Sequence, residues 1–318
     1  MGTRLLGPWR RHWFTPAPLT DLGVGRVVLA AILLWLGPTT RYLRVALIAP
    51  SLWVPVPLIS ALGIGQPGLA TLRWMGTVTA LLLVFAAAGV GTRVALVLLV
   101  PLVLVQEAWL NCMGKVTHGT IPLLWALLFF ALAPCDRSVT LASALRRVRR
   151  PSEGTTPAPE SRDSPYARWP LELLFVELAG FYFLAGLAKL RAGGLAWADG
   201  YTLQYHLLAN LQHSGPGAYW LAEHLGLCRL ASILVLVFEL GMPLGLVRRL
   251  RPLALAGGAL FHGATTWFLG ITFWPVVALY ALFVPWTRIG HALGRRTARA
   301  RAGGTVGGGP DVTARTSA

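Results

Sequence analysis

Long apolar segments separated by short polar ones run along the chain from about residue 22 to residue 287. Several are long enough to cross a bilayer, and none alternates as the strands of a membrane barrel do. We therefore expect an all-α integral membrane protein. It would be a polytopic helical bundle of about eight transmembrane helices with short interfacial helices on the outer side. The predicted spans are 22–38, 74–90, 94–111, 119–134, 169–190, 229–247, 252–270 and 273–287.

Polar segments divide this pattern into parts. Residues 146–168 are rich in proline, serine and glutamate and predict a disordered cytoplasmic linker between two four-span halves, 1–145 and 169–290. The Gly/Arg/Thr-rich residues 291–318 predict a disordered cytoplasmic tail. Prolines and glycines in 39–70 indicate an outer re-entrant or interfacial segment. Asp199 is placed to cap a short amphipathic helix over about 200–212 at the outer interface.

Composition and charge agree with a membrane setting. The mean hydropathy is +0.61, and 13% of residues are charged, against about 25% in soluble domains. The pI of 11.2 reflects arginines that face anionic lipid, so we expect the bilayer and not nucleic acid as the partner. If both termini are cytoplasmic, 21 of the 28 cations fall on inner segments, as the positive-inside rule requires. We predict a multi-pass protein of the cell membrane.

Only two of the 28 cationic residues are lysines, Lys115 and Lys189. Arginine stays protonated in proteins, whereas a buried lysine can give up its proton and serve as a base. Retention of lysine in a chain so rich in arginine therefore makes both residues candidates for chemistry. The alternative is that each is an interfacial cation that extends to the membrane surface.

Polar residues of the predicted outer half supply further candidates. A first group, spaced by four, four and three residues, would share a face if the third span continued as a helix: Glu107, Asn111, Lys115 and His118. In the fifth span Tyr182 and Lys189 share a face that Glu177 does not. Intramembrane carboxylates need partners, so Glu239 should face the bundle interior and hydrogen-bond a neighbouring span. His262 is a pocket residue or a hydrogen-bonded core residue.

The three cysteines leave two alternatives open. Cys112 and Cys228 fall on the outer side in this topology and Cys135 on the inner side. An outer pair could form a disulfide in an oxidising compartment, or all three could be separate buried thiols. No spacing of cysteine and histidine resembles a zinc site, so we expect no metal.

The run from Tyr182 to Leu190, which contains Ala185-Gly186 and Lys189-Leu190, is followed by Trp197, Gly200 and Tyr201. This pattern resembles the signature of the HTTM (horizontally transferred transmembrane) family, which includes vitamin K-dependent gamma-carboxylase-like proteins. The family likeness extends over about 20–287 and includes the stretch from Asn111 to Gly119, the run from Ala133 to Ser138, and Phe261-His262.

The resemblance implies a function. In the animal carboxylase the lysine that matches Lys189 is regarded as the base that deprotonates vitamin K hydroquinone on the luminal side. By resemblance, Lys189 is the base, and His118 and His262 bind or polarise a vitamin K- or menaquinol-like quinol. Trp197, Tyr201 and Tyr182, with Lys115 and Glu107, would line its pocket. Such a protein would be a quinol-dependent carboxylase or oxygenase.

Two other classes of function remain open. The first is a non-catalytic membrane scaffold, or a lipid- or quinone-binding partner of a redox protein such as a thiol-disulfide oxidoreductase. The second is a small-solute transporter, although the paired broken helices of a transporter are not evident in the two halves. An enzyme should bring Lys189 and a histidine to the wall of one closed cavity.

The arginine distribution makes a topology prediction. A cysteine introduced at Ser152, in the linker, should react with a membrane-impermeant thiol reagent only after the inner membrane is opened, because the linker lies on the cation-rich side. The measurement is labelling in intact and in permeabilised cells. Labelling in intact cells would reverse the predicted orientation.

Overall fold

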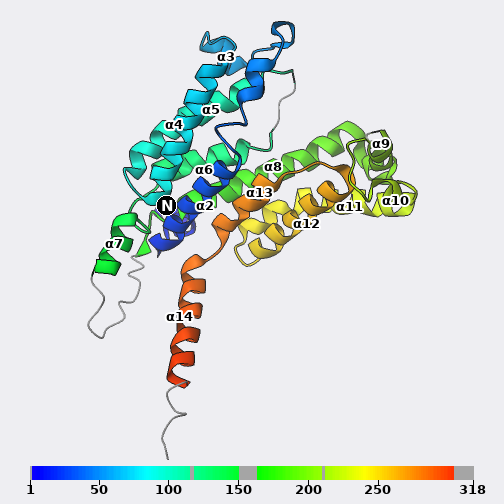
Figure 1. Cartoon of the computed structure of the whole chain (residues 1–318). Coiled ribbons are helices and arrows are strands. Elements are labelled where there is room, and N and C mark those ends of the chain that lie inside the picture. The colour runs from blue at the N-terminus through cyan, green and yellow to red at the C-terminus, as the bar shows by residue number, and fades with distance from the viewer. Residues whose placement is uncertain (1, 115–117, 150–162, 210–211, 304–318) are drawn as a thin grey trace, which may run out of the picture.

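A computed structural model describes residues 2–114, 118–149, 163–209 and 212–303 (Figure 1). Lys115 and Ser152 lie outside these residues. The described chain is almost entirely helical. Its strands are the two-residue β1 (Ala17–Pro18) and β2 (Asp163–Ser164), which pair antiparallel, and one isolated bridge joins Val54 to Met113. The all-α expectation is confirmed for the described residues.

Each of the eight predicted apolar segments contains a helix. These helices are α2 (Leu19–Trp35), α4 (Leu69–Ala88), α5 (Thr92–Leu110), α6 (Ile121–Leu132), α8 (Trp169–Gly193), α11 (Leu225–Gly241), α12 (Arg251–Leu269) and α13 (Trp274–Leu279). Shorter or more polar helices join them: α1 (Gly2–Phe14), α3 (Pro57–Ala61), α7 (Leu141–Arg149), α9 (Tyr201–Ala209), α10 (Ala218–Ala222) and α14 (Trp286–Gly303). Five 3₁₀ segments complete the described helices: η1 (Leu43–Leu47), η2 (Pro50–Leu52), η3 (Gly194–Asp199), η4 (Met242–Leu246) and η5 (Tyr280–Phe283).

Fewer helices than eight have the length and hydropathy of a membrane span. Among the described residues four qualify: Leu69–Ala88, Thr92–Leu110, Trp169–Asp199 and Leu225–Leu246. A fifth is obtained if Trp274–Phe283 and Trp286–Arg295, which are bent by 65° at their junction, form one broken span. The α6 helix has 12 residues and so extends only about 18 Å, short of the hydrocarbon core. The predicted count of eight is therefore not confirmed.

The helices form two diverging groups that meet at their base (Figure 1). In the first group α4 packs against both α2 and α5, and α5 packs against α6. In the second, α8 packs against α11 and η4, and η4 packs against α12. The largest apolar core lies where the groups join and includes Leu29, Leu99, Phe130 and Leu174. The outward faces of α4, α5, α8 and α11 carry exposed apolar side chains, as lipid contact requires.

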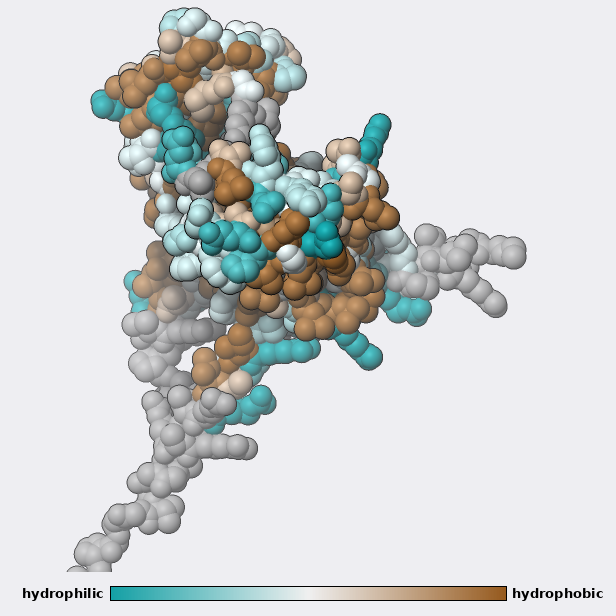
Figure 2. All heavy atoms as spheres, turned by 90° about the vertical axis from the view of Figure 1, so that its right-hand side faces the viewer, coloured by the Kyte–Doolittle hydropathy of each residue, from teal (hydrophilic) through white to brown (hydrophobic). Residues whose placement is uncertain are grey.

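Short helices lie at the ends of the two groups. In Figure 1, α7, the N-terminus and the beginning of α14 lie near one end, and α3 and the pair α9–α10 lie at the far ends. Figure 2 looks toward α9 and α10 and shows hydrophilic residues gathered beside a broad hydrophobic surface. The pairing of β1 with β2 places described parts of the N-terminal and linker regions together. The membrane side that each end faces stays a prediction.

Parts of three segments that were predicted to be irregular or disordered form helices or a strand. Residues 39–70 form η1, η2 and α3, and buried Val45 and Ile59 pack with Trp109 at the end of α5. Of the segments predicted to be disordered, residues 146–149 continue α7, 163–164 pair with β1, and 291–303 continue α14. Alanine and arginine favour helix, and the neighbouring β1 gives 163–164 a partner. The remaining parts lie outside the described residues.

All three cysteines are buried free thiols. Cys112 packs in the cluster around Tyr42 and Trp109, and Cys228 packs in a separate cluster around Leu207. The structure therefore contains no disulfide between Cys112 and Cys228.

A buried arginine ties the base of the first group together. Arg26, on α2, is 1% exposed, and its guanidinium donates hydrogen bonds to four backbone carbonyls, those of Cys135 (2.6 Å), Ser138 (3.3 Å), Val139 (2.5 Å) and Ala87 (3.3 Å). One side chain thus joins α2 to the end of α4 and to the turn after α6. Lysine, with three donors on one atom, cannot reproduce this planar arrangement.

Glu172 plays the corresponding part in the second group. It is 3% exposed at the start of α8 and accepts hydrogen bonds from Arg248 (2.9 Å) and Arg251 (2.5 and 3.3 Å). His12 of α1 lies 3.6 Å from the same carboxylate. The contacts hold the start of α12 and the end of α1 against α8.

The Arg26 contacts generate a prediction about stability. Arg26→Lys should lower the free energy of unfolding by about 1–3 kcal/mol, because at least one buried carbonyl loses its donor. The matched control is Arg93→Lys, at a side chain that is 52% exposed beside Asp136, where the change should be within about 0.5 kcal/mol. Thermal unfolding in detergent, followed by circular dichroism, measures both. Equal effects of the two changes would contradict the anchoring role of Arg26.

Candidate functional site

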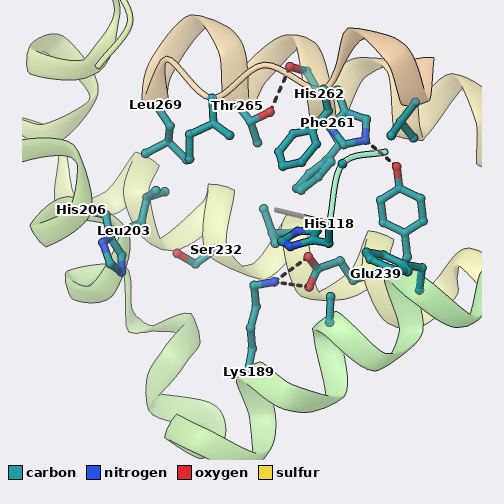
Figure 3. A pocket seen from close by; sticks show the side chains of 18 of the residues that line it. His118, Lys189, Leu203, His206, Ser232, Glu239, Phe261, His262, Thr265 and Leu269 are labelled. Atoms are coloured by element: carbon teal, nitrogen blue, oxygen red, sulfur yellow. Dashed lines mark hydrogen bonds and ion pairs between the residues drawn. The ribbon is translucent and has the colours of Figure 1, made fainter. Parts of the chain in front are cut away.

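A cavity of about 710 Å³ lies in the second group of helices, toward the end that carries α9 and α10 (Figure 3). Much of its wall is apolar and aromatic, with Leu178 and Phe181 from α8, Val235 from α11 and Phe261 from α12. Polar side chains from several elements also reach the wall: His118, Tyr182, Lys189, Thr202, His206, His213, Ser232, Glu239, His262 and Thr265. The cavity therefore combines apolar walls with a limited set of polar groups, as small-molecule sites do.

An ion pair joins α8 to α11 at this wall. Lys189 Nζ lies 2.6 and 2.8 Å from the two carboxylate oxygens of Glu239 (Figure 3). The Lys189 side chain is 27% exposed and that of Glu239 is 3% exposed. Nζ also lies 5.4 Å from the centroid of the Trp197 ring, within the range of a cation–π contact. The prediction that Glu239 faces the interior and hydrogen-bonds a neighbouring span is confirmed.

A close approach of the two helices makes this pair possible. Gly186 lies one turn before Lys189, and a Cβ there would be 3.0 Å from the Cβ of Glu239 and 3.1 Å from the side chain of Leu240. Small residues allow helix backbones in membranes to approach closely. Gly186 thus belongs to the architecture of the site, although it contributes no side chain to it.

A chain of hydrogen bonds runs behind a second part of the wall. The hydroxyl of Tyr280 lies 2.7 Å from that of Tyr182, which in turn lies 2.5 Å from Nε2 of His262. If Tyr280 donates to Tyr182 and Tyr182 donates to His262, only Nδ1 of His262 lacks a partner among the described residues. The opposite direction would also leave the Tyr280 proton unpaired. Because each unpaired buried group costs about 1–3 kcal/mol, we assign the proton of neutral His262 to Nδ1.

His118 completes the central part of the cavity. Its ring centroid lies 5.5 Å from that of Phe181 and 6.0 Å from that of Phe273, so three segments of the chain bring flat rings together. His118 comes from the segment between α5 and α6. Its neighbour in sequence, Lys115, lies outside the described residues.

Two of the predicted pocket residues lie elsewhere. Tyr201 is 57% exposed and is not among the described lining residues of the cavity. Its backbone N–H donates to Asp199 Oδ1 at 2.9 Å, which confirms that Asp199 caps the short helix α9. Tyr201 therefore begins the short helix α9, whereas Trp197, four residues earlier, reaches the wall.

Glu107 belongs to a separate structural contact. It is 5% exposed and accepts hydrogen bonds from Arg41 (3.2 and 3.4 Å), the Tyr42 hydroxyl (2.8 Å) and Thr120 (2.7 Å). Burial and the nearby Glu107 carboxylate raise the pKa of Tyr42 above its ordinary value. These contacts tie the segment after α2 to α5 and α6.

The helix that would align Glu107, Asn111, Lys115 and His118 on one face ends before Lys115. The α5 helix ends at Leu110 with Asn111 as its C-cap, and Gly114 has a φ of +76°, which a helix cannot accommodate. The broken helix separates the first members of this set from His118. Glu107 becomes part of the fold, and His118 becomes part of the cavity.

Several residues of the wall were not predicted from the sequence. Ser232 is 0% exposed, and its hydroxyl has no hydrogen-bond partner among the described residues. It precedes Glu239 by seven residues, two turns of α11, so the shared helical face was the signal that could have identified it. His206, His213 and Thr265 carried no comparable signal. The pairing of Lys189 with Glu239, 50 residues apart, was likewise not expected.

Comparison with known families gives one match. Residues 146–287 match the model of the HTTM domain, a range that contains Lys189, Ser232, Glu239 and His262. The family resemblance is confirmed for this range. No curated protein and no solved structure matches the chain.

The tyrosine chain makes a prediction that a close glycine can test. A Cβ at Gly258 of α12 would lie 2.4 Å from the Tyr280 hydroxyl, so Gly258→Ala must displace Tyr280 from Tyr182. We expect a loss of about 1–3 kcal/mol in the free energy of unfolding, as for overpacking in a core. Thermal unfolding in detergent measures it.

Gly263→Ala is the control on the same helix, because a Cβ there meets no atom within 4 Å. It should leave stability unchanged or raise it slightly. If both alanine variants unfold alike, the Tyr280 hydroxyl is not confined as the structure indicates.

Proposed function

On the premise that residues 146–287 of this membrane protein form an HTTM domain, we propose that its cavity binds a quinol and that Lys189 acts there as a base. The quinol would be of the vitamin K or menaquinol type, and the reaction would be an oxygenation or carboxylation that depends on it. The observation that supports this most directly is that Lys189, His118 and His262 line one largely apolar cavity.

The residues of the wall fit such a ligand. A volume of about 710 Å³ lies in the ordinary range for small-molecule sites. The aromatic side chains of Phe181 and Phe273, together with His118, suit a flat ring system. Two buried polar atoms of wall residues, Ser232 Oγ and His262 Nδ1, have no partner among the described residues, so hydroxyl or carbonyl oxygens of a ligand would satisfy them.

Each polar group has a definite task in this proposal. A quinol supplies electrons and acidic hydroxyl protons when it is bound. Lys189 takes up a proton at Nζ, and Glu239 and Trp197 hold its side chain at the wall. His262 donates from Nδ1 while the tyrosine chain fixes its tautomer. The apolar walls exclude water, which strengthens each of these polar interactions.

A non-catalytic role is the second candidate, and the ion pair favours it. In contact with Glu239, Lys189 already has a partner for its charge, so the same cavity could hold a quinone or lipid without proton transfer. The protein would then act as the quinone-binding partner of a membrane redox protein, such as a thiol-disulfide oxidoreductase. Mass spectrometry of lipids that co-purify with the solubilised protein identifies the ligand in either case.

Replacement of Lys189 separates the two candidates. Lys189→Arg keeps the positive charge and the contact with Glu239 but removes the capacity to act as a base. We expect quinone binding to persist and quinol-dependent turnover to fall at least ~100-fold, the lower end for loss of a general base. Anaerobic binding and oxygen-dependent quinol oxidation are the two measurements.

The control is the reverse substitution, arginine to lysine, at a nearby position of the same helix. Arg191→Lys lies two residues farther along α8, at an exposed position that does not line the cavity, and should leave both measurements unchanged. Full turnover by Lys189→Arg would eliminate the base assignment. Quinone binding without turnover in the unaltered protein would favour the non-catalytic role.

A further inference from the structure

The ion pair at the cavity wall poses a chemical problem for any base at Lys189. An ammonium group that donates at 2.6 and 2.8 Å to both oxygens of Glu239 has no lone pair with which to accept a proton. A neutral amine must therefore arise after some change in the site. Glu239 is the nearest acceptor, and it is the one carboxylate among the described residues that line the cavity.

We propose that filling the cavity with an apolar ring transfers one proton from Lys189 to Glu239. Glu239 is thus a positioning residue that stores this proton and leaves Lys189 as a neutral amine. The inference rests on the proposed function, because it concerns how that same site becomes able to accept a proton from its ligand.

The transfer is balanced within the pair. One N–H bond breaks at Lys189 Nζ, and one O–H bond forms at a carboxylate oxygen of Glu239, across the contacts of 2.6 and 2.8 Å. The ammonium and the carboxylate become an amine and a carboxylic acid, so the net charge of the pair is zero before and after. No proton enters or leaves the cavity, and no oxidant or reductant takes part.

Before a ligand binds, water in the cavity stabilises the charged form of the Lys189–Glu239 pair. The Lys189 side chain is 27% exposed, so water can solvate the ammonium on its open side. Once a ring displaces that water, each buried charge carries a desolvation penalty of several kcal/mol. The neutral pair avoids this penalty and retains a hydrogen bond. The Trp197 ring, 5.4 Å from Nζ, also stabilises the ammonium, but its cation–π interaction is much weaker than the hydration that the ammonium loses.

The surroundings contain little else that would hold the pair in its charged form. The other titratable side chains on the wall are those of His118, Tyr182, His206, His213 and His262, none of which is an acid that could replace Glu239 beside Nζ. On the far side of the pair, Gly186 fixes the approach of α8 to α11. The proton can therefore move without any displacement of the helices.

Infrared difference spectroscopy tests this inference on the chain's own carboxyl group. The probe is 2-methylnaphthalene, which has the ring system of a naphthoquinol but no oxygen, so it adds no carbonyl band. Its binding to the solubilised protein is measured separately by equilibrium dialysis. We expect binding to produce a new protonated-carboxyl band in the unaltered protein. The band should be absent in Glu239→Gln and shifted in Glu239→Asp, which keeps a carboxyl group.

Several outcomes would overturn the inference. They are a bound probe with no carboxyl band, a band that persists in Glu239→Gln, and failure of the probe to bind at all. If Glu239→Gln does not fold, the baseline is Lys189→Met combined with Glu239→Gln, because replacing both members of a buried pair is far better tolerated than replacing one. The proposed function is tested separately, by anaerobic dialysis with 2-methyl-1,4-naphthohydroquinone for quinol binding and by oxygen-dependent quinol oxidation for the base chemistry.

Discussion

Polar groups inside an apolar bundle must find their partners within the protein, because lipid offers none. The buried charged residues of this chain obey that constraint in one of two ways. Arg26, Glu107 and Glu172 are each bound by several groups from different segments and hold helix ends in place. Glu239 has one strong partner, Lys189, and faces a cavity. The residues with several partners stabilise the fold, whereas Glu239 has one partner and lines the cavity.

The apolar pattern predicts the helices well because it acts locally. Each predicted span contains a helix, and the interior position of Glu239 follows from the cost of exposing a carboxylate to lipid. The number of spans was harder to predict, because an apolar segment can form a helix too short to cross the bilayer, as α6 does. The length of each predicted span was taken from the length of its apolar segment. The actual helix ends where the backbone turns, as it does for α6 at Ala133.

Part of the cavity wall could be predicted from the sequence, but the pairing of its residues could not. Lysine retention and the family signature identify Lys189, and His118 and His262 do join it on one wall. Tyr201 and Glu107 lie outside because a helix cap and a broken helix redirect them. Contacts between α8 and α11 depend on the rotation and approach of two helices far apart in the chain, which no local spacing encodes.

Two glycines explain why the polar groups of the cavity differ in freedom. Gly258 lets the Tyr280 hydroxyl lie directly against α12, so the tyrosine chain is enclosed and His262 keeps one tautomer. Gly186 brings Glu239 to Lys189 but leaves the lysine partly open to the cavity. In our proposal a fixed donor therefore lies near a pair whose protonation depends on what fills the cavity. That combination suits a site in which the ligand itself creates the base, and a rigid, fully enclosed lysine would lack this dependence.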